Sequence, residues 1–219
     1  MSAISPESCS KRSPVYRQLQ GAEFEVIDGG AHALHSANDS SEQLAKGGLV
    51  DLSLVSRCGV RGPGAIDWLT QQGLPVPAAP NQAATDSQGQ TVLRLSKTEH
   101  WLLRNPLQPE QQAPQIAGQG CYPVYCEDSR CWLVLTGDNR AQVMAKVCGV
   151  DLRKDVFELG QVVQTSIARV NAVIVHHQIN QHEVFSIFSD SASAEYLWEA
   201  MLDAMAEFDG AMMGANSFS

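Results

Sequence analysis

The sequence lacks the features that mark several large classes of protein. Its 219 residues carry a formal net charge of −9, and Lys and Arg form no basic cluster. A protein that neutralises nucleic-acid phosphates or an anionic membrane surface needs a basic face, so the sequence argues against both partners. It also has no apolar run near the ~18 residues that span a bilayer, and no signal peptide. We therefore expect a cytoplasmic protein.

Motifs for catalysis are also missing. The sequence has no G-x-S-x-G nucleophile motif and no C-x-x-C pair. The adjacent carboxylates Glu127 and Asp128 are expected in an exposed turn, and Arg153, Lys154 and Asp155 in a solvated connection. We therefore assign no catalytic, cofactor-binding or metal-binding residue.

Three of the six cysteines, Cys121, Cys126 and Cys131, are evenly spaced by five residues. In a reducing compartment we expect them to be buried thiols rather than disulfides. Cys126 and Cys131 could still meet across a turn formed by the intervening "EDSR". A cysteine nucleophile needs a positioned histidine base, and the sequence marks none.

His176, His177 and His182 form an H-H-x4-H cluster that resembles a metal site. Zinc requires ligands that converge tetrahedrally, whereas adjacent residues of a strand point to opposite faces. We therefore interpret "HHQINQHEV" as a polar hairpin between two strands and not as a metal site.

The stretch "SRCGVRGPGAIDWL" at 56–69 contains three glycines, Gly59, Gly62 and Gly64, where a phosphate-binding loop would lie. Their spacing matches neither G-x-G-x-x-G nor G-x-x-x-x-G-K-[ST]. Pro63 suits the first position of a helix, and Gly73 suits a left-handed residue that ends it. We predict that this loop only turns the chain into an amphipathic helix.

A repeated order of elements predicts the fold class. Two segments, 57–76 and 130–152, share one order: Arg-Cys, a strand-like run, a glycine, a predicted helix and a second glycine. A third segment, 182–210, again runs from a predicted strand to a predicted helix. Repeated strand–helix units indicate an α+β fold in which helices pack on mostly antiparallel sheets. In the third unit Asp190 or Ser191 is expected to cap the helix. Its apolar stripe is expected to lie in the core, with a subunit interface as the alternative.

The chain is predicted to consist of a partly irregular N-terminal arm or loop (1–48), one domain (49–209) and a tail (210–219). Within the arm, the polar stretch at 29–48 is predicted to be a loop or disordered. The domain is divided into two similar halves at 49–120 and 121–209, and segments 75–90 and 105–120 are predicted surface connections. Strands are predicted at 48–54, 91–95, 100–104, 122–126, 131–135, 162–167, 170–177 and 184–188.

Four stretches occur in an order that resembles the gamma subunit of heterotetrameric sarcosine oxidase. They are "LVDLSLVSRCGVRGPGAIDWLTQQGLPVP" at 49–77, "TEHWLLR" at 98–104, "SRCWLVLTGDNRAQVMAKVCGVDLRKDVFELGQVVQTSIARV" at 129–170, and "VFSIFSDSASAEYLWEAMLDA" at 184–204. The resemblance lies in their succession along the whole domain and not in one motif.

The resemblance implies the fold of the folate-binding domain of glycine-cleavage T-protein, an aminomethyltransferase. It implies assembly with alpha, beta and delta subunits into a complex of one-carbon metabolism. In that family flavin oxidises the N-methyl group of sarcosine, and tetrahydrofolate captures the one-carbon unit. FAD, FMN, NAD and tetrahydrofolate belong there to other subunits. We therefore expect this chain to bind no cofactor and to be inactive alone.

Three alternatives remain open at this stage. The chain could be the matching subunit of an N-methylglutamate dehydrogenase, or a structural partner of an unrelated enzyme. It could also be a free-standing folate-binding or one-carbon transfer protein. A pterin ring needs a buried carboxylate and an aromatic wall, for which Glu99 and Trp101 are the candidates. Their simpler interpretation is as residues at the edge of a strand.

Overall fold

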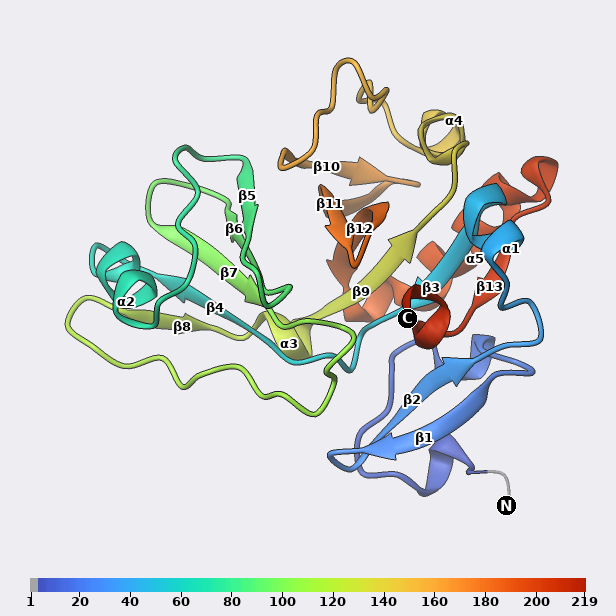
Figure 1. Ribbon diagram of the computed structural model, residues 1–219, viewed down its shortest axis with the longest axis horizontal. Coiled ribbons are helices and arrows are strands. Elements are labelled where there is room, and N and C mark those ends of the chain that lie inside the picture. The colour runs from blue at the N-terminus through green and yellow to red at the C-terminus, as the bar shows by residue number, and fades with distance from the viewer. Residues whose placement is uncertain (1–3) are drawn as a thin grey trace.

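The computed structural model describes residues 4–219, which form two large β-sheets, a hairpin and five α-helices (Figure 1). The larger sheet has the order β10 (Val162–Ile167), β11 (Val170–Ile179), β12 (His182–Asp190), β9 (Arg130–Leu135), β3 (Gly48–Asp51) and β13 (Ala211–Met213). The five-stranded sheet has the order β5 (Gln82–Thr85), β6 (Thr91–Arg94), β7 (Glu99–Leu103), β4 (Arg57–Arg61) and β8 (Tyr122–Val124). Neighbouring strands are antiparallel except β13 and β3, which are parallel.

The α-helices are short. They are α1 (Ser41–Lys46), α2 (Ala65–Gln71), α3 (Cys126–Ser129), α4 (Arg140–Val147) and α5 (Ala194–Met205). Single turns of 3-10 helix occur at Pro6–Ser8, Tyr16–Gln18, Ser191–Ser193, Ala206–Phe208 and Ala215–Phe218. None of the helices in residues 4–219 has the length and apolar character needed to cross a membrane.

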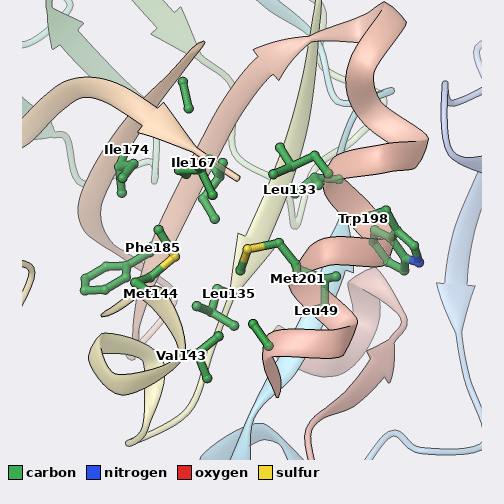
Figure 2. Packing of buried hydrophobic residues seen from close by; sticks show 14 of the residues in the cluster. Leu49, Leu133, Leu135, Val143, Met144, Ile167, Ile174, Phe185, Trp198 and Met201 are labelled. Atoms are coloured by element: carbon green, nitrogen blue, oxygen red, sulfur yellow. The ribbon is translucent and has the colours of Figure 1, made fainter. Parts of the chain in front are cut away.

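Side chains alternate between two cores along β9, because successive strand residues point to opposite faces. Leu133 and Leu135 face α4 and α5, where they belong to one buried cluster with Met144 and Met201 (Figure 2). Full burial of one such side chain stabilises the fold by about 1.5–3 kcal/mol. This core attaches both helices to one face of the six-stranded sheet.

The opposite face of the six-stranded sheet packs against the five-stranded sheet. Trp132 and Phe188 lie in this second core, and the ring of Phe188 contacts Trp101 of β7 edge to face at 5.8 Å. The far side of the five-stranded sheet is covered by α2 through Trp68 and Leu69. The layers therefore run helix, sheet, sheet, helix, with α2 and the α4–α5 pair at opposite ends of Figure 1.

Each of the eight residue ranges predicted to be strands overlaps a strand of the structure, so these predictions are confirmed. The third helix is confirmed as a core element, because Leu197, Trp198 and Met201 are all buried. Asp190 accepts a hydrogen bond from Ala192 N at 3.0 Å and so caps the 3-10 turn that leads into α5.

The N-terminal segment is more regular than predicted. Residues 29–48, predicted to be a loop, contain strand β2 (Gly30–His35) and helix α1. Strand β2 pairs with β1 (Glu23–Ile27) across a two-residue turn in which Asp28 and Gly29 both have positive φ. The Asp-Gly pair is the usual sequence signal for such a turn. In the predicted tail, β13 forms the edge of the six-stranded sheet.

The two large sheets exchange strands across the predicted division at 120 and 121. Strand β8 follows this point in the sequence but pairs with β4 in the five-stranded sheet. Strand β3 lies before it but pairs with β9 in the six-stranded sheet. The predicted connection at 75–90 contains β5, an edge strand whose residues are exposed or intermediate in burial.

Candidate functional site

The glycine-rich loop before α2 turns the chain, as predicted. Its amides already have protein acceptors, since Gly62 N donates to Thr98 O at 2.9 Å and Gly64 N to Gly120 O at 3.1 Å. A Cβ at Gly62 would lie 2.0 Å from Gly120 O, so neighbouring backbone fills the space that an anion would need. Helix α2 begins at Ala65, so Pro63 precedes the helix rather than occupying its first position.

His176 and His177 lie on opposite faces of the sheet, as the strand geometry predicted. Strands β11 and β12 form a hairpin in which Ile179 pairs with His182. His176 faces the α4 side with Phe157 and Phe185, and His177 faces the core between the sheets with Ser186. The hairpin is less polar than predicted, because His176 and His177 are both buried. Within residues 4–219 no group of three or more His, Cys, Asp or Glu side chains is arranged to hold a metal ion.

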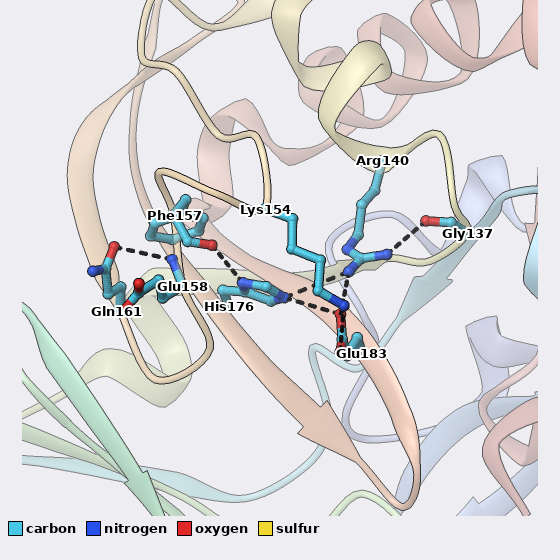
Figure 3. Close-up of polar contacts among 8 residues, drawn as sticks. All are labelled: Gly137, Arg140, Lys154, Phe157, Glu158, Gln161, His176 and Glu183. Atoms are coloured by element: carbon cyan, nitrogen blue, oxygen red, sulfur yellow. Dashed lines mark hydrogen bonds and ion pairs between the residues drawn. The ribbon is translucent and has the colours of Figure 1, made fainter.

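A polar cluster surrounds His176 beside a cavity of about 510 Å³ (Figure 3). Glu183 accepts hydrogen bonds from Arg140 at 2.7 Å and from Lys154 at 3.1 Å. The Nε2 atom of His176 lies 3.6 Å from Glu183 Oε2. The cluster therefore joins α4, β11, β12 and the segment that follows Leu152. Lys154 lies in a solvated connection, as predicted, with 77% of its side chain exposed, and from there it reaches Glu183.

The protonation states in this cluster follow from burial and pairing. Burial lowers the pKa of His176, although its bond to the Phe157 carbonyl opposes the shift. The hydrogen bond from Lys154 lowers the pKa of Glu183. His176 is then neutral, donates from Nδ1 to Phe157 O at 2.7 Å and presents its Nε2 lone pair towards Arg140. Each charged group already has a protein partner, so the cluster stabilises the contact between α4 and the β11–β12 hairpin.

The thiols of Cys126 and Cys131 are held in their protonated form. All six cysteines are free, and Cys126 and Cys131 are buried. Burial raises the pKa of both thiols to about 11, far above the range of a thiolate nucleophile. The "EDSR" segment lies within and just after helix α3 and does not form the predicted turn.

Glu127 was expected to lie in an exposed turn with Asp128, but its side chain is bound by other protein groups. Its carboxylate accepts from Ser56 Oγ and from Arg57 N, both at 3.0 Å. Arg57 itself is buried and donates to five backbone carbonyls, those of Ser53, Val55, Cys126, Glu127 and Arg130. This contact fixes α3 to the start of β4.

The pterin candidates Glu99 and Trp101 are occupied by neighbouring side chains. Trp101 Nε1 donates to Glu99 Oε1 at 3.2 Å, and Arg61 donates to the other carboxylate oxygen, Oε2, at 2.9 Å from its Nε. Trp101 lies on β7 between β6 and β4, so it is inside the sheet and not at its edge. Both oxygens of the carboxylate therefore already accept hydrogen bonds from protein donors.

No family model matches this chain, and neither does any curated protein. Solved structures do match it. One is a chain of heterotetrameric sarcosine oxidase from Corynebacterium sp. U-96 in complex with pyrrole 2-carboxylate. It has a TM-score of 0.63 and 23% identity over 91% of this chain and 97% of that one. Another is the glycine cleavage system aminomethyltransferase T from Bartonella henselae. It has a TM-score of 0.68 and 22% identity over 94% of this chain and 60% of that one. The chain has the aminomethyltransferase-like fold.

The likeness confirms the fold class predicted from the sequence. Helices pack on mostly antiparallel sheets in an aminomethyltransferase-like arrangement. The coverage differs between the two matches. This chain spans nearly the whole length of the matched sarcosine oxidase chain but less than two thirds of the aminomethyltransferase.

Proposed function

We propose that this chain is a non-catalytic subunit, corresponding to the gamma subunit, of a heterotetrameric sarcosine oxidase-like complex. The observation that carries the proposal is the end-to-end match, because the chain covers 97% of one chain of such a heterotetramer. Its own role is assembly. The alpha, beta and delta partners carry FAD, FMN, NAD and tetrahydrofolate, oxidise the N-methyl group and pass on the one-carbon unit.

The side chains of the polar clusters support a non-catalytic role. Glu183 is engaged by two cations, and Glu99 by Arg61 and Trp101. Burial holds Cys58, with a pKa raised to about 12, in its protonated form. An acid, base or nucleophile in an active site needs a free face towards substrate, and these groups are directed at other protein groups.

One edge of the five-stranded sheet is suited to contact a partner subunit. Tyr122 and Tyr125, on and directly after edge strand β8, expose 63% and 72% of their surface. Tyrosine is enriched at protein interfaces, and an edge strand carries unpaired backbone donors and acceptors. We propose that a flavin-bearing subunit covers this edge in the complex.

The test is co-purification of the tagged chain after co-expression with its neighbouring genes. We expect flavin-bearing subunits to elute with it in a stable complex, and Tyr125→Ser to weaken their retention. Tyr196→Ser is the matched control, because Tyr196 is also exposed but lies on α5. A chain that stays a free monomer beside those subunits would refute the proposal.

A free-standing folate-binding protein is the second candidate, and the likeness to aminomethyltransferase T favours it. Tetrahydrofolate is titrated into the purified chain while tryptophan fluorescence is followed. Saturable micromolar binding by the isolated chain would support this candidate, and the absence of any fluorescence change would remove it.

A further inference from the structure

A second cavity lies between the two large sheets, away from the His176 cluster. Its volume is about 640 Å³, within the roughly 300–1,000 Å³ typical of small-molecule sites. Strands of both sheets line it, β5, β6 and β7 on one side and β9 and β11 on the other. Two of its lining residues, His177 and Arg104, carry buried nitrogen atoms that have no hydrogen-bond partner.

The hydrogen bonds of His177 determine its tautomer. Trp132 Nε1 can only donate, and it lies 2.8 Å from Ser186 Oγ. We assign the hydroxyl proton of Ser186 to His177 Nε2, 2.7 Å away, because that proton has no other acceptor among residues 4–219. His177 therefore carries its own proton on Nδ1. Burial lowers the pKa of His177 to about 4, so at neutral pH the ring is an uncharged donor whose Nδ1–H has no acceptor.

Arg104 brings a positive charge to the same cavity. Its guanidinium donates to the amide oxygens of Gln90 and Gln111 rather than to a carboxylate, and its buried Nε has no partner. Asp86 also lines the cavity, but it accepts the backbone N–H groups of Gln88 and Gln90, each at 2.9 Å. Among residues 4–219 no carboxylate forms an ion pair with Arg104, although Asp86 also carries its negative charge at the cavity wall.

The remaining wall of the cavity is partly apolar. Leu103, Trp132 and Ile179 contribute buried side chains. Leu159 is 50% exposed and also lines the cavity, where a bound apolar group would cover it. Buried donors without acceptors beside an apolar surface are the arrangement that fixes an amphiphilic ligand in one orientation.

We propose that this cavity binds a small organic carboxylate. The carboxylate accepts hydrogen bonds from Arg104 and from the Nδ1–H of His177, and the apolar part of the ligand packs against Leu103 and Leu159. Charge-assisted bonds from a guanidinium favour a carboxylate over a neutral amide of the same shape. The site does not depend on the proposed function, because it requires no partner subunit.

Isothermal titration calorimetry of the full chain tests this with benzoate, its neutral isostere benzamide, and inorganic phosphate. We expect one benzoate per chain and benzamide binding weaker by about tenfold or more. Arg104→Gln should weaken benzoate binding about tenfold, whereas Arg153→Gln, at an exposed arginine paired with Asp151, should leave it unchanged. Equal affinity for benzoate and benzamide, unchanged affinity in Arg104→Gln, or binding of phosphate alone would overturn the proposal.

An NMR measurement on the unmodified chain covers the case in which Arg104→Gln fails to fold. The imidazole nitrogen resonances of His177 should identify a neutral ring with the proton on Nδ1. Added benzoate should shift the Nδ1 resonance and leave that of Nε2, which is held by Ser186, nearly unchanged. Saturable benzoate binding with no change at Nδ1 would place the ligand elsewhere and contradict the proposal.

Discussion

Arg57 donates hydrogen bonds to five backbone carbonyls, more than any other side chain described above. Arg57→Leu leaves these carbonyls without a donor, and we expect it to lower the free energy of unfolding by about 3–5 kcal/mol. Urea denaturation followed by circular dichroism measures the change. Arg61→Leu is the control on the same strand. Arg61 is exposed, so its pairing with Glu99 should contribute less than about 1 kcal/mol.

His100 is fully buried on β7, and neither of its ring nitrogens has a partner. We expect His100→Leu to raise the free energy of unfolding by about 1–3 kcal/mol, because it removes two unsatisfied polar atoms from an apolar layer. Thermal unfolding at neutral pH measures the effect. A variant less stable than the original chain would contradict this account of His100.

The pH dependence of stability follows from the same residue. Burial lowers the pKa of His100 to about 4 from 6.5, so between these values the unfolded chain binds a proton that the folded chain does not. The free energy of unfolding should therefore decrease as the pH falls from 6.5 towards 4, by on the order of 3 kcal/mol for this histidine. His100→Leu should reduce that slope but not abolish it, because His177 is shifted in the same direction. An unchanged slope would be inconsistent with this assignment.

At the scale of the elements, Gly62 is constrained by the backbone of a distant loop. Gly62→Ala places a methyl group against Gly120 O at a φ of +126°, so we expect a loss of about 2–4 kcal/mol. Gly73→Ala is the matched control, since Gly73 also has a positive φ (+68°) but open space around it. Its cost should be about 1–2 kcal/mol. Denaturant unfolding of both variants compares them, and equal losses would show that the close approach is unimportant.

Strands with strong apolar alternation or β-branched runs could be predicted from the sequence, and weaker ones could not. Strands β9, β11 and β12 are mostly buried, and β10 alternates between more and less exposed residues, so their patterns identify them. Strand β13 has three residues, and its pairing with β3 joins opposite ends of the chain. Local propensity carries no information about such long-range contacts, so tertiary packing decides them.

The residues of the cavity between the sheets could not be predicted for a similar reason. Arg104 and His177 lie far apart in the sequence, and each alone resembles an ordinary strand residue. The sequence did predict that His176 and His177 face opposite ways, because that follows from strand geometry alone. Their burial, and the partners of Ser186, depend on how the two sheets pack.

At the scale of the whole molecule, the exchange of strands β3 and β8 makes the two sheets depend on one another. We expect a fragment containing residues 1–120 to remain unfolded, because it lacks β8 and the α3 carbonyls that Arg57 requires. Circular dichroism and amide NMR dispersion of the fragment measure this. Co-expression with residues 121–219 should restore folding, and a fragment that folds cooperatively alone would contradict the prediction.

At this scale we propose that the chain supports assembly and performs no oxidation itself. The most direct measurement is sarcosine-dependent oxygen consumption, together with visible flavin absorbance after gel filtration, for the isolated chain and for the co-expressed complex. We predict no turnover and no retained flavin for the isolated chain, and turnover by the complex that contains it. Oxidation of sarcosine by the isolated chain, or flavin that stays bound to it, would contradict the account.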